Sequence, residues 1–297
     1  MTTIPSAIGI GVLVLLAGTL PLGALRVANL QIGVAFPWSI VPIALFLYAY
    51  WQFIGGRWGA PAAAAKRREM LRANPLSCRV WAASLAAGLI GFGALICVLV
   101  LAARLVRLPD SSAIVTPPDM PAVTALALIM LASVVAGVTE EAAFRGYMQG
   151  PIERRHGVAI AILVNGLVFG LLHFPTHPAE VLWMLPYYVA VSAVYGGLTW
   201  AANSILPAVV LHTAGDIVVL IRWWLTGRPE WQIGSVLPPL VWESGIDAHF
   251  VLVASASVAL VLATAGAYGV VRKLRVQEGG GMSLEIAAAG VTPQRVG

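Results

Sequence analysis

Charged residues are scarce in this sequence. Asp, Glu, Lys and Arg make up 10% of its 297 residues, whereas soluble domains carry about 25%. Hydrophobic residues make up 59% of the chain, and its mean hydropathy is +0.87. These values exclude an ordinary soluble domain and predict a polytopic membrane protein that folds as one bundle.

Cysteine is nearly absent. Cys78 and Cys97 are the two in the chain, 19 residues apart, which is roughly 28 Å along one predicted helix. They cannot pair with each other, so no disulfide framework or cysteine metal site follows. The net charge of +5 does not indicate nucleic-acid binding, because the basic residues lie in short loops between apolar runs and are typical of topology signals.

Apolar runs long enough to cross a membrane need about 20 residues. The apolar runs of this sequence predict an all-α, polytopic bundle of about eight transmembrane helices. The sixth contains Pro186 and is expected to be kinked or partly re-entrant. The expected ranges are 4–22, 36–54, 80–103, 122–149, 157–174, 180–200, 204–225 and 249–271.

The basic loops fall mainly on one side of this eight-helix count. They follow the second, fourth and eighth helices, and the positive-inside rule then puts both termini in the cytoplasm of a cell-membrane protein. Residues 62–72 are expected to form a basic helix on the lipid surface. His177 lies between Pro175 and Pro178 and is expected in a surface loop.

Four segments are expected along the chain. Residues 1–121 hold the first three helices and a basic cytoplasmic loop, and residues 122–225 hold the functional core. Residues 226–271 hold a loop and the last helix, and residues 272–297 a Gly-rich tail expected to be disordered.

Ionisable groups at membrane depth are costly and usually mark an active site or a pathway. The first such group is Glu140-Glu141 followed by Arg145. Glu141 and Arg145 are four apart and can pair on one helix face, whereas Glu140 points about 100° away. Since two adjacent carboxylates in low dielectric cannot both ionise cheaply, Arg145 keeps one charged and the other is a candidate general base. The plain alternative is an ion pair that locks two helices.

Two further motifs place histidines in apolar runs. His173 follows Phe169 by four residues, and Asp216 follows His212 by four. A carboxylate at that spacing can hold an imidazole in one tautomer or join it as a metal ligand. The alternatives are an interfacial histidine and a polar lock between helices. The fourth and fifth predicted helices run antiparallel from the loop that holds Arg154 and Arg155. The distances along these helices to Glu140 and to His173 are similar, so both residues are expected in one layer of the bundle. His212 is expected to reach the same layer from the seventh helix.

The ordered set Glu-Glu-x-x-x-Arg, Phe-x-x-x-His and His-x-x-x-Asp over about residues 122–222 resembles the CPBP family of CAAX-processing and bacteriocin-processing (Abi) intramembrane endopeptidases. The resemblance implies that Glu140 and His173 activate water for peptide hydrolysis. It implies that His212 and Asp216 support the oxyanion. An ionised aspartate only accepts hydrogen bonds, so Asp216 is expected to orient His212.

The resemblance leaves the chemistry open between two kinds of protease. The preferred interpretation needs no cofactor and uses a water activated by glutamate. The alternative is a zinc protease with Glu140, His173 and His212 as ligands. The expected partners are the lipid bilayer and a peptide or membrane-protein substrate, either lipidated or a bacteriocin leader, with no nucleic acid. A non-enzymatic scaffold, immunity protein or transporter with a polar core is the rival class, although no internal repeat of the transporter kind is found.

Overall fold

The fold is a bundle of helices, with no strand in the described part of the chain. The structure is a computed structural model and describes residues 3–107, 119–174, 181–228, 232 and 236–288; His177 lies outside these residues. The elements are α1 (Ile4–Ile32), α2 (Ile40–Ile54), α3 (Pro61–Leu71), α4 (Cys78–Leu105), α5 (Ala122–Glu140), η1 (Glu141–Met148), α6 (Gln149–His156), α7 (Val158–Leu172), α8 (Val181–Ala202), α9 (Leu206–Thr226), α10 (Val241–Ser244) and α11 (Ala248–Ala288).

The predicted membrane bundle is confirmed. Five stretches are long and apolar enough to cross a membrane: Ile4–Ile32, Cys78–Leu105, Ala122–His156, Leu206–Thr226 and Ala248–Glu278. The helices α2 and α7 are shorter and apolar, and with α8 they bring the count to about eight. The protein is therefore a multi-pass membrane protein.

Three expected boundaries differ in the structure. The first helix runs on to Ile32 rather than ending at residue 22, and Pro21 lies inside it. Pro186 lies inside α8, which is one continuous helix, so the re-entrant alternative is not realised. The last helix continues to Ala288, into the segment expected to be disordered, while residues 289–297 lie outside the described part.

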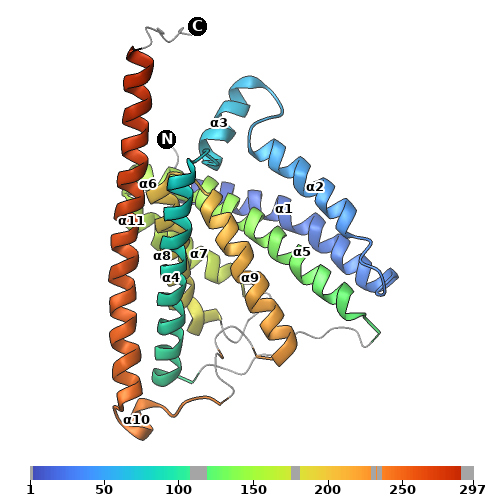
Figure 1. The fold of residues 1–297 in the computed structure, drawn as a ribbon. Helices are drawn as coiled ribbons and strands as arrows, with labels where there is room; N and C mark the ends of the chain where they lie inside the picture. Colours follow the sequence, from blue (N-terminus) through green and yellow to red (C-terminus); the bar gives the residue numbers. More distant parts are fainter. Residues whose placement is uncertain (1–2, 108–118, 175–180, 229–231, 233–235, 289–297) are drawn as a thin grey trace.

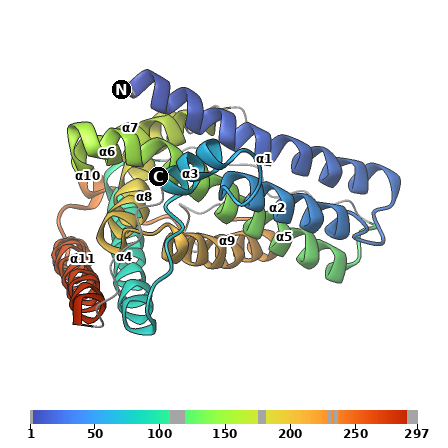
Figure 2. The ribbon, with the colours of Figure 1, turned by 90° about the horizontal axis from the view of Figure 1, so that it is seen from above.

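The bundle has two recognisable ends. One end carries α3, α6 and the end of α11, and the other carries α10 (Figure 1). At the α10 end, buried Arg104 donates to Asp247 at 3.1 and 2.9 Å. These hydrogen bonds from Arg104 hold the pKa of Asp247 below its ordinary value. Seen from above, α4 and α11 lie along one side of the bundle and α1 and α2 along another (Figure 2).

The centre of the bundle is the π-helical segment η1, which joins α5 to α6 and whose eight residues are all buried. Its neighbours come from much of the chain. Tyr147 donates to the Ile54 carbonyl of α2 at 2.6 Å, and a methyl group on Gly146 would lie 3.0 Å from the Leu71 carbonyl of α3. The helices α1, α2 and α3 therefore pack directly against the segment that carries Glu141 and Arg145.

Candidate active site

The candidate site is built around the carboxylate of Glu141. Its Oε1 lies 3.1 Å from Arg145 Nη1 within η1 and 2.7 Å from His212 Nδ1 of α9. The side chains of Glu141 and Arg145 are both 0% exposed, and that of His212 is 7% exposed. The predicted Glu141–Arg145 pair is confirmed, and the structure adds His212 as its third member.

The π-helical turn explains how both glutamates reach one histidine. In a regular α-helix, adjacent side chains diverge by about 100°. Here the wider turn starts at Glu141, and its end is marked by Gln149, whose main-chain N–H bonds to the carbonyl of Phe144, five residues back. A wider turn rotates each successive residue less, so Glu140 stays near His212, at 3.7 Å from Nε2. Single π-turns of this kind are frequent at functional sites.

His212 is oriented by Glu141 and not by Asp216, which corrects the expectation from the sequence. The Glu141 carboxylate accepts this hydrogen bond, so His212 Nδ1 carries the hydrogen. The other ring nitrogen, Nε2, is then directed at Glu140 and Asp216, whose oxygens lie 3.7 and 3.6 Å away. Glu140 is 20% and Asp216 32% exposed, so Nε2 faces the accessible side of the cluster.

Arg145 is surrounded by aromatic rings. Its Cζ lies 5.2 Å from the ring centre of Tyr195, 5.3 Å from that of Phe169 and 5.8 Å from that of Phe144. Within the described residues, no guanidinium nitrogen of Arg145 donates a hydrogen bond, so the 3.1 Å contact to Glu141 is an ion pair without hydrogen-bond alignment. The buried cation is therefore balanced by one carboxylate and by ring faces.

His173 lies in the aromatic part of the site. Its ring stacks on Tyr188 at 4.6 Å and meets Phe169 edge-on at 4.7 Å. Its Nδ1 donates to the Phe169 carbonyl at 2.8 Å, which fixes the direction of the ring. Through Phe169 this cluster adjoins Arg145, so all three sequence motifs meet in one region.

Sequence reasoning missed Tyr188 and Tyr195 of α8. Tyr195 stacks on His212 at 4.9 Å with an interplanar angle of 14°, and both tyrosines are buried. The two tyrosines are seven positions apart, which is nearly two turns, so they share one face of the helix. This spacing could have indicated a shared face in the sequence, but aromatic residues spaced in this way more often belong to an ordinary hydrophobic core.

The predicted zinc ligands do not form a metal centre as they are arranged. In the part of the chain that the structure describes, no group of three or more His, Cys, Asp or Glu side chains is placed to hold a metal ion. His173 lies instead among aromatic rings. Glu140, His173 and His212 therefore do not fit a zinc site in this conformation.

Gly137 allows α5 and α9 to approach at the level of the site. A methyl group there would meet Thr213 Oγ1 and would lie 3.0 Å from the Thr213 main-chain nitrogen and 3.1 Å from the Val209 carbonyl. We expect Gly137→Ala to push α9 away and move His212. The expected loss of kcat is on the order of 100-fold, the scale of a misplacement of about 1 Å, measured as peptide cleavage per folded molecule.

Gly266→Ala is the matched control for this substitution. Gly266 also lies in a membrane helix, but a methyl group there meets nothing within 4 Å. It should leave cleavage unchanged. Full activity of Gly137→Ala would show that the spacing of α5 and α9 does not matter to the site.

The comparison with protein families agrees with this geometry. Residues 122–218 match the family model described as type II CAAX prenyl endopeptidase Rce1-like. This part of the chain is similar to a domain of the CAAX protease family. The match runs from the start of α5 past Asp216 and confirms the resemblance inferred from the three motifs. The family implies an intramembrane endopeptidase that acts on a peptide or protein in the membrane. Searches of curated proteins and of solved structures found no match.

Proposed function

We propose that the protein is an intramembrane endopeptidase in which Glu140, together with His173, activates the hydrolytic water. The difference between the two adjacent glutamates carries this proposal. Glu141 is fully buried and held by Arg145 and His212. Glu140 keeps 20% of its exposure, so its carboxylate is the one that can meet water.

The proposed reaction needs one base and one oxyanion donor. With His173 as the second group that binds the water, Glu140 takes a proton from it while the water oxygen attacks the scissile carbonyl carbon. A protonated His212, anchored through Nδ1 by Glu141, donates from Nε2 to the oxyanion that develops. The C–N bond then breaks, and Glu140 returns the proton to the leaving amine. In this scheme Asp216 stabilises the charge of His212 from the Nε2 side.

The substrate class is proposed from the description of the matching family. A prenylated peptide end fits the description of the family, and a bacteriocin leader is the second candidate. A quenched-fluorescence peptide, tested with and without a farnesyl group on its cysteine, separates these classes. Terminal-peptide proteomics of a deletion strain, complemented with the wild type or with Glu140→Ala, identifies the cellular substrate.

We further propose that the protein lies in the cell membrane with both termini in the cytoplasm. The basic segments at α3 and α6 lie at the same end of the bundle as the end of α11 (Figure 1), and that end should face the cytoplasm. A reporter fused to the C-terminus that becomes active outside the cytoplasm would overturn this orientation.

Substitution of Asp216 separates the metal-free reaction from the zinc alternative. We expect Asp216→Asn to retain substantial activity, because Glu141 and not Asp216 holds Nδ1 of His212, and the amide can donate to an oxyanion. If Asp216 instead supported a metal ligand, the loss would be about 10–100-fold. The measurement is cleavage together with bound zinc in both proteins. One zinc per wild-type molecule, with activity removed by phenanthroline and restored by zinc, would contradict the metal-free reaction.

A further inference from the structure

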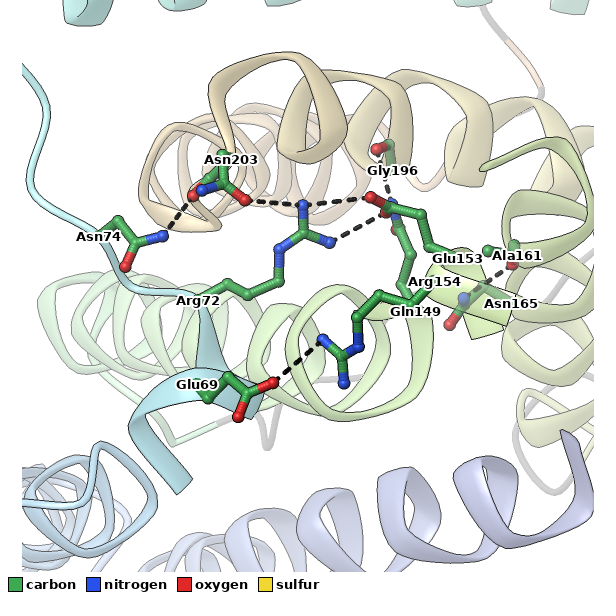
Figure 3. Close-up of polar contacts among 10 residues, drawn as sticks. All are labelled: Glu69, Arg72, Asn74, Gln149, Glu153, Arg154, Ala161, Asn165, Gly196 and Asn203. Atoms are coloured by element: carbon green, nitrogen blue, oxygen red, sulfur yellow. Dashed lines mark hydrogen bonds and ion pairs between the residues drawn. The ribbon is translucent and has the colours of Figure 1, made fainter. Parts of the chain in front are cut away.

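A second buried polar cluster lies outside the candidate site, at the end of the bundle that carries α3 and α6 (Figure 3). Arg72 donates to Glu153 Oε2 at 2.9 Å and Oε1 at 3.4 Å, and to Asn203 Oδ1 at 3.3 Å. Gln149 Nε2 donates to Glu153 at 3.0 Å and to the Gly196 carbonyl at 2.9 Å. The side chains of Arg72 and Glu153 are 9% and 17% exposed. Neither the sequence motifs nor the proposed reaction uses these residues.

The cluster also holds the main chain at Arg72 and in the residues that follow it. The Arg72 carbonyl accepts from Ile205 N–H at 3.1 Å, and Asn74 Nδ2 donates to the Asn203 carbonyl at 2.7 Å. Arg72 and Asn203 both have left-handed backbones, with φ of 55° and 52°. Such conformations are costly for residues other than glycine and persist where the surroundings fix them.

These contacts involve the two elements that carry the Glu141–His212 pair. Asn203 lies in the turn that starts α9, which carries His212. Glu153 lies on α6, which continues η1 and so the segment that carries Glu141. The guanidinium of Arg72 contacts both elements at once, and its planar fork fixes geometry as well as charge.

We propose that Arg72 is a positioning residue that, through Glu153 and Asn203, holds α9 and η1 in the register that keeps His212 against Glu141. The inference deepens the proposed function and rests on it for its kinetic part. A neighbouring ion pair, Arg154–Glu69, gives the contrast: its partners are 3.7 Å apart and 53% and 67% exposed. That pair ties α6 to α3 without touching α9.

The first test compares Arg72→Gln with Arg154→Gln in the full-length protein. Arg72→Gln removes the fork that joins α6 to the start of α9. We expect its kcat on the farnesylated peptide to fall roughly 10–100-fold per folded molecule, with little change in KM. Arg154→Gln should keep the wild-type kcat. Equal kcat values for wild type and Arg72→Gln, or equal losses in the two variants, would overturn the proposal.

Asn203→Gly separates positioning from stability. Glycine adopts a left-handed backbone without strain, so the variant should fold at least as well as the wild type while losing the side-chain acceptor for Arg72. We expect a several-fold lower kcat together with an unchanged or higher melting temperature. A merely structural contact would not lower activity while stability is kept, so an unchanged kcat counts against the proposal.

An NMR measurement tests the positioning without any activity. In protein labelled with ¹⁵N-histidine, the Nδ1 signal of His212 reports its hydrogen bond to Glu141, and His212→Gln assigns it. Arg72→Gln should shift this signal, and Arg154→Gln should not. If the wild type cleaves no peptide but the signal shifts as expected, the proposed function fails and the positioning stands. An unmoved signal in Arg72→Gln overturns the positioning alone.

Discussion

Replacing Glu140 with glutamine should abolish peptide cleavage and leave the bundle folded. The amide has the size and shape of the carboxylate but cannot take a proton from water. General-base catalysis contributes about 10²–10⁴-fold to a reaction rate. The kcat for cleavage of the farnesylated peptide should therefore fall by about 10²-fold or more. The fold should tolerate the change, because Glu140 is partly exposed and the neighbouring His212 is held by Glu141 instead. The measurement is kcat in detergent, with the melting temperature recorded on the same sample.

Glu243→Gln is a suitable control for this experiment. Glu243 lies on α10, at the end of the bundle away from α3 and α6. Its side chain is 57% exposed and pairs with Arg107. It should leave kcat unchanged. A Glu140→Gln protein that cleaves as fast as the wild type would show that Glu140 is not the base.

Replacing Arg145 with alanine should damage both folding and catalysis. The change strands Glu141 as a buried carboxylate without its cation, and breaking a buried pair in this way typically costs ~3–5 kcal/mol. It also removes the cation packed among Phe144, Phe169 and Tyr195. With its orienting carboxylate disturbed, His212 should lose its fixed direction. The expected results are low yield, a lower melting temperature and little cleavage by the fraction that folds.

Two substitutions sharpen the test of Arg145. Arg145→Lys keeps the charge but loses the planar group that packs on rings, so it should be milder than alanine. Combining Arg145→Ala with Glu141→Gln removes the stranded charge and should recover part of the lost stability without restoring activity. A normal melting temperature for Arg145→Ala alone would contradict the buried pair.

The sequence by itself determined the class of the protein and predicted the polar residues of its candidate site. Few charges and long apolar runs predicted a helical membrane bundle, because lipid requires each spanning segment to satisfy its own backbone hydrogen bonds. Helical spacing predicted the Glu141–Arg145 pair, since residues four apart share a face wherever the helix is placed. The ordered motifs also indicated the family and the residues Glu140, His173, His212 and Asp216.

The tertiary structure alone decided which of these groups touch. The π-turn at Glu141 has no sequence signal in the motif, yet it turns both glutamates toward α9. The orientation of His212 by Glu141, rather than by Asp216 on its own helix, depends on how η1 and α9 are rotated and spaced. The stacking of Tyr195 on His212 and the contacts of Arg72 depend on the same packing. Spacing within one helix follows from local geometry that every chain shares, whereas contacts between helices depend on the packing of the whole core.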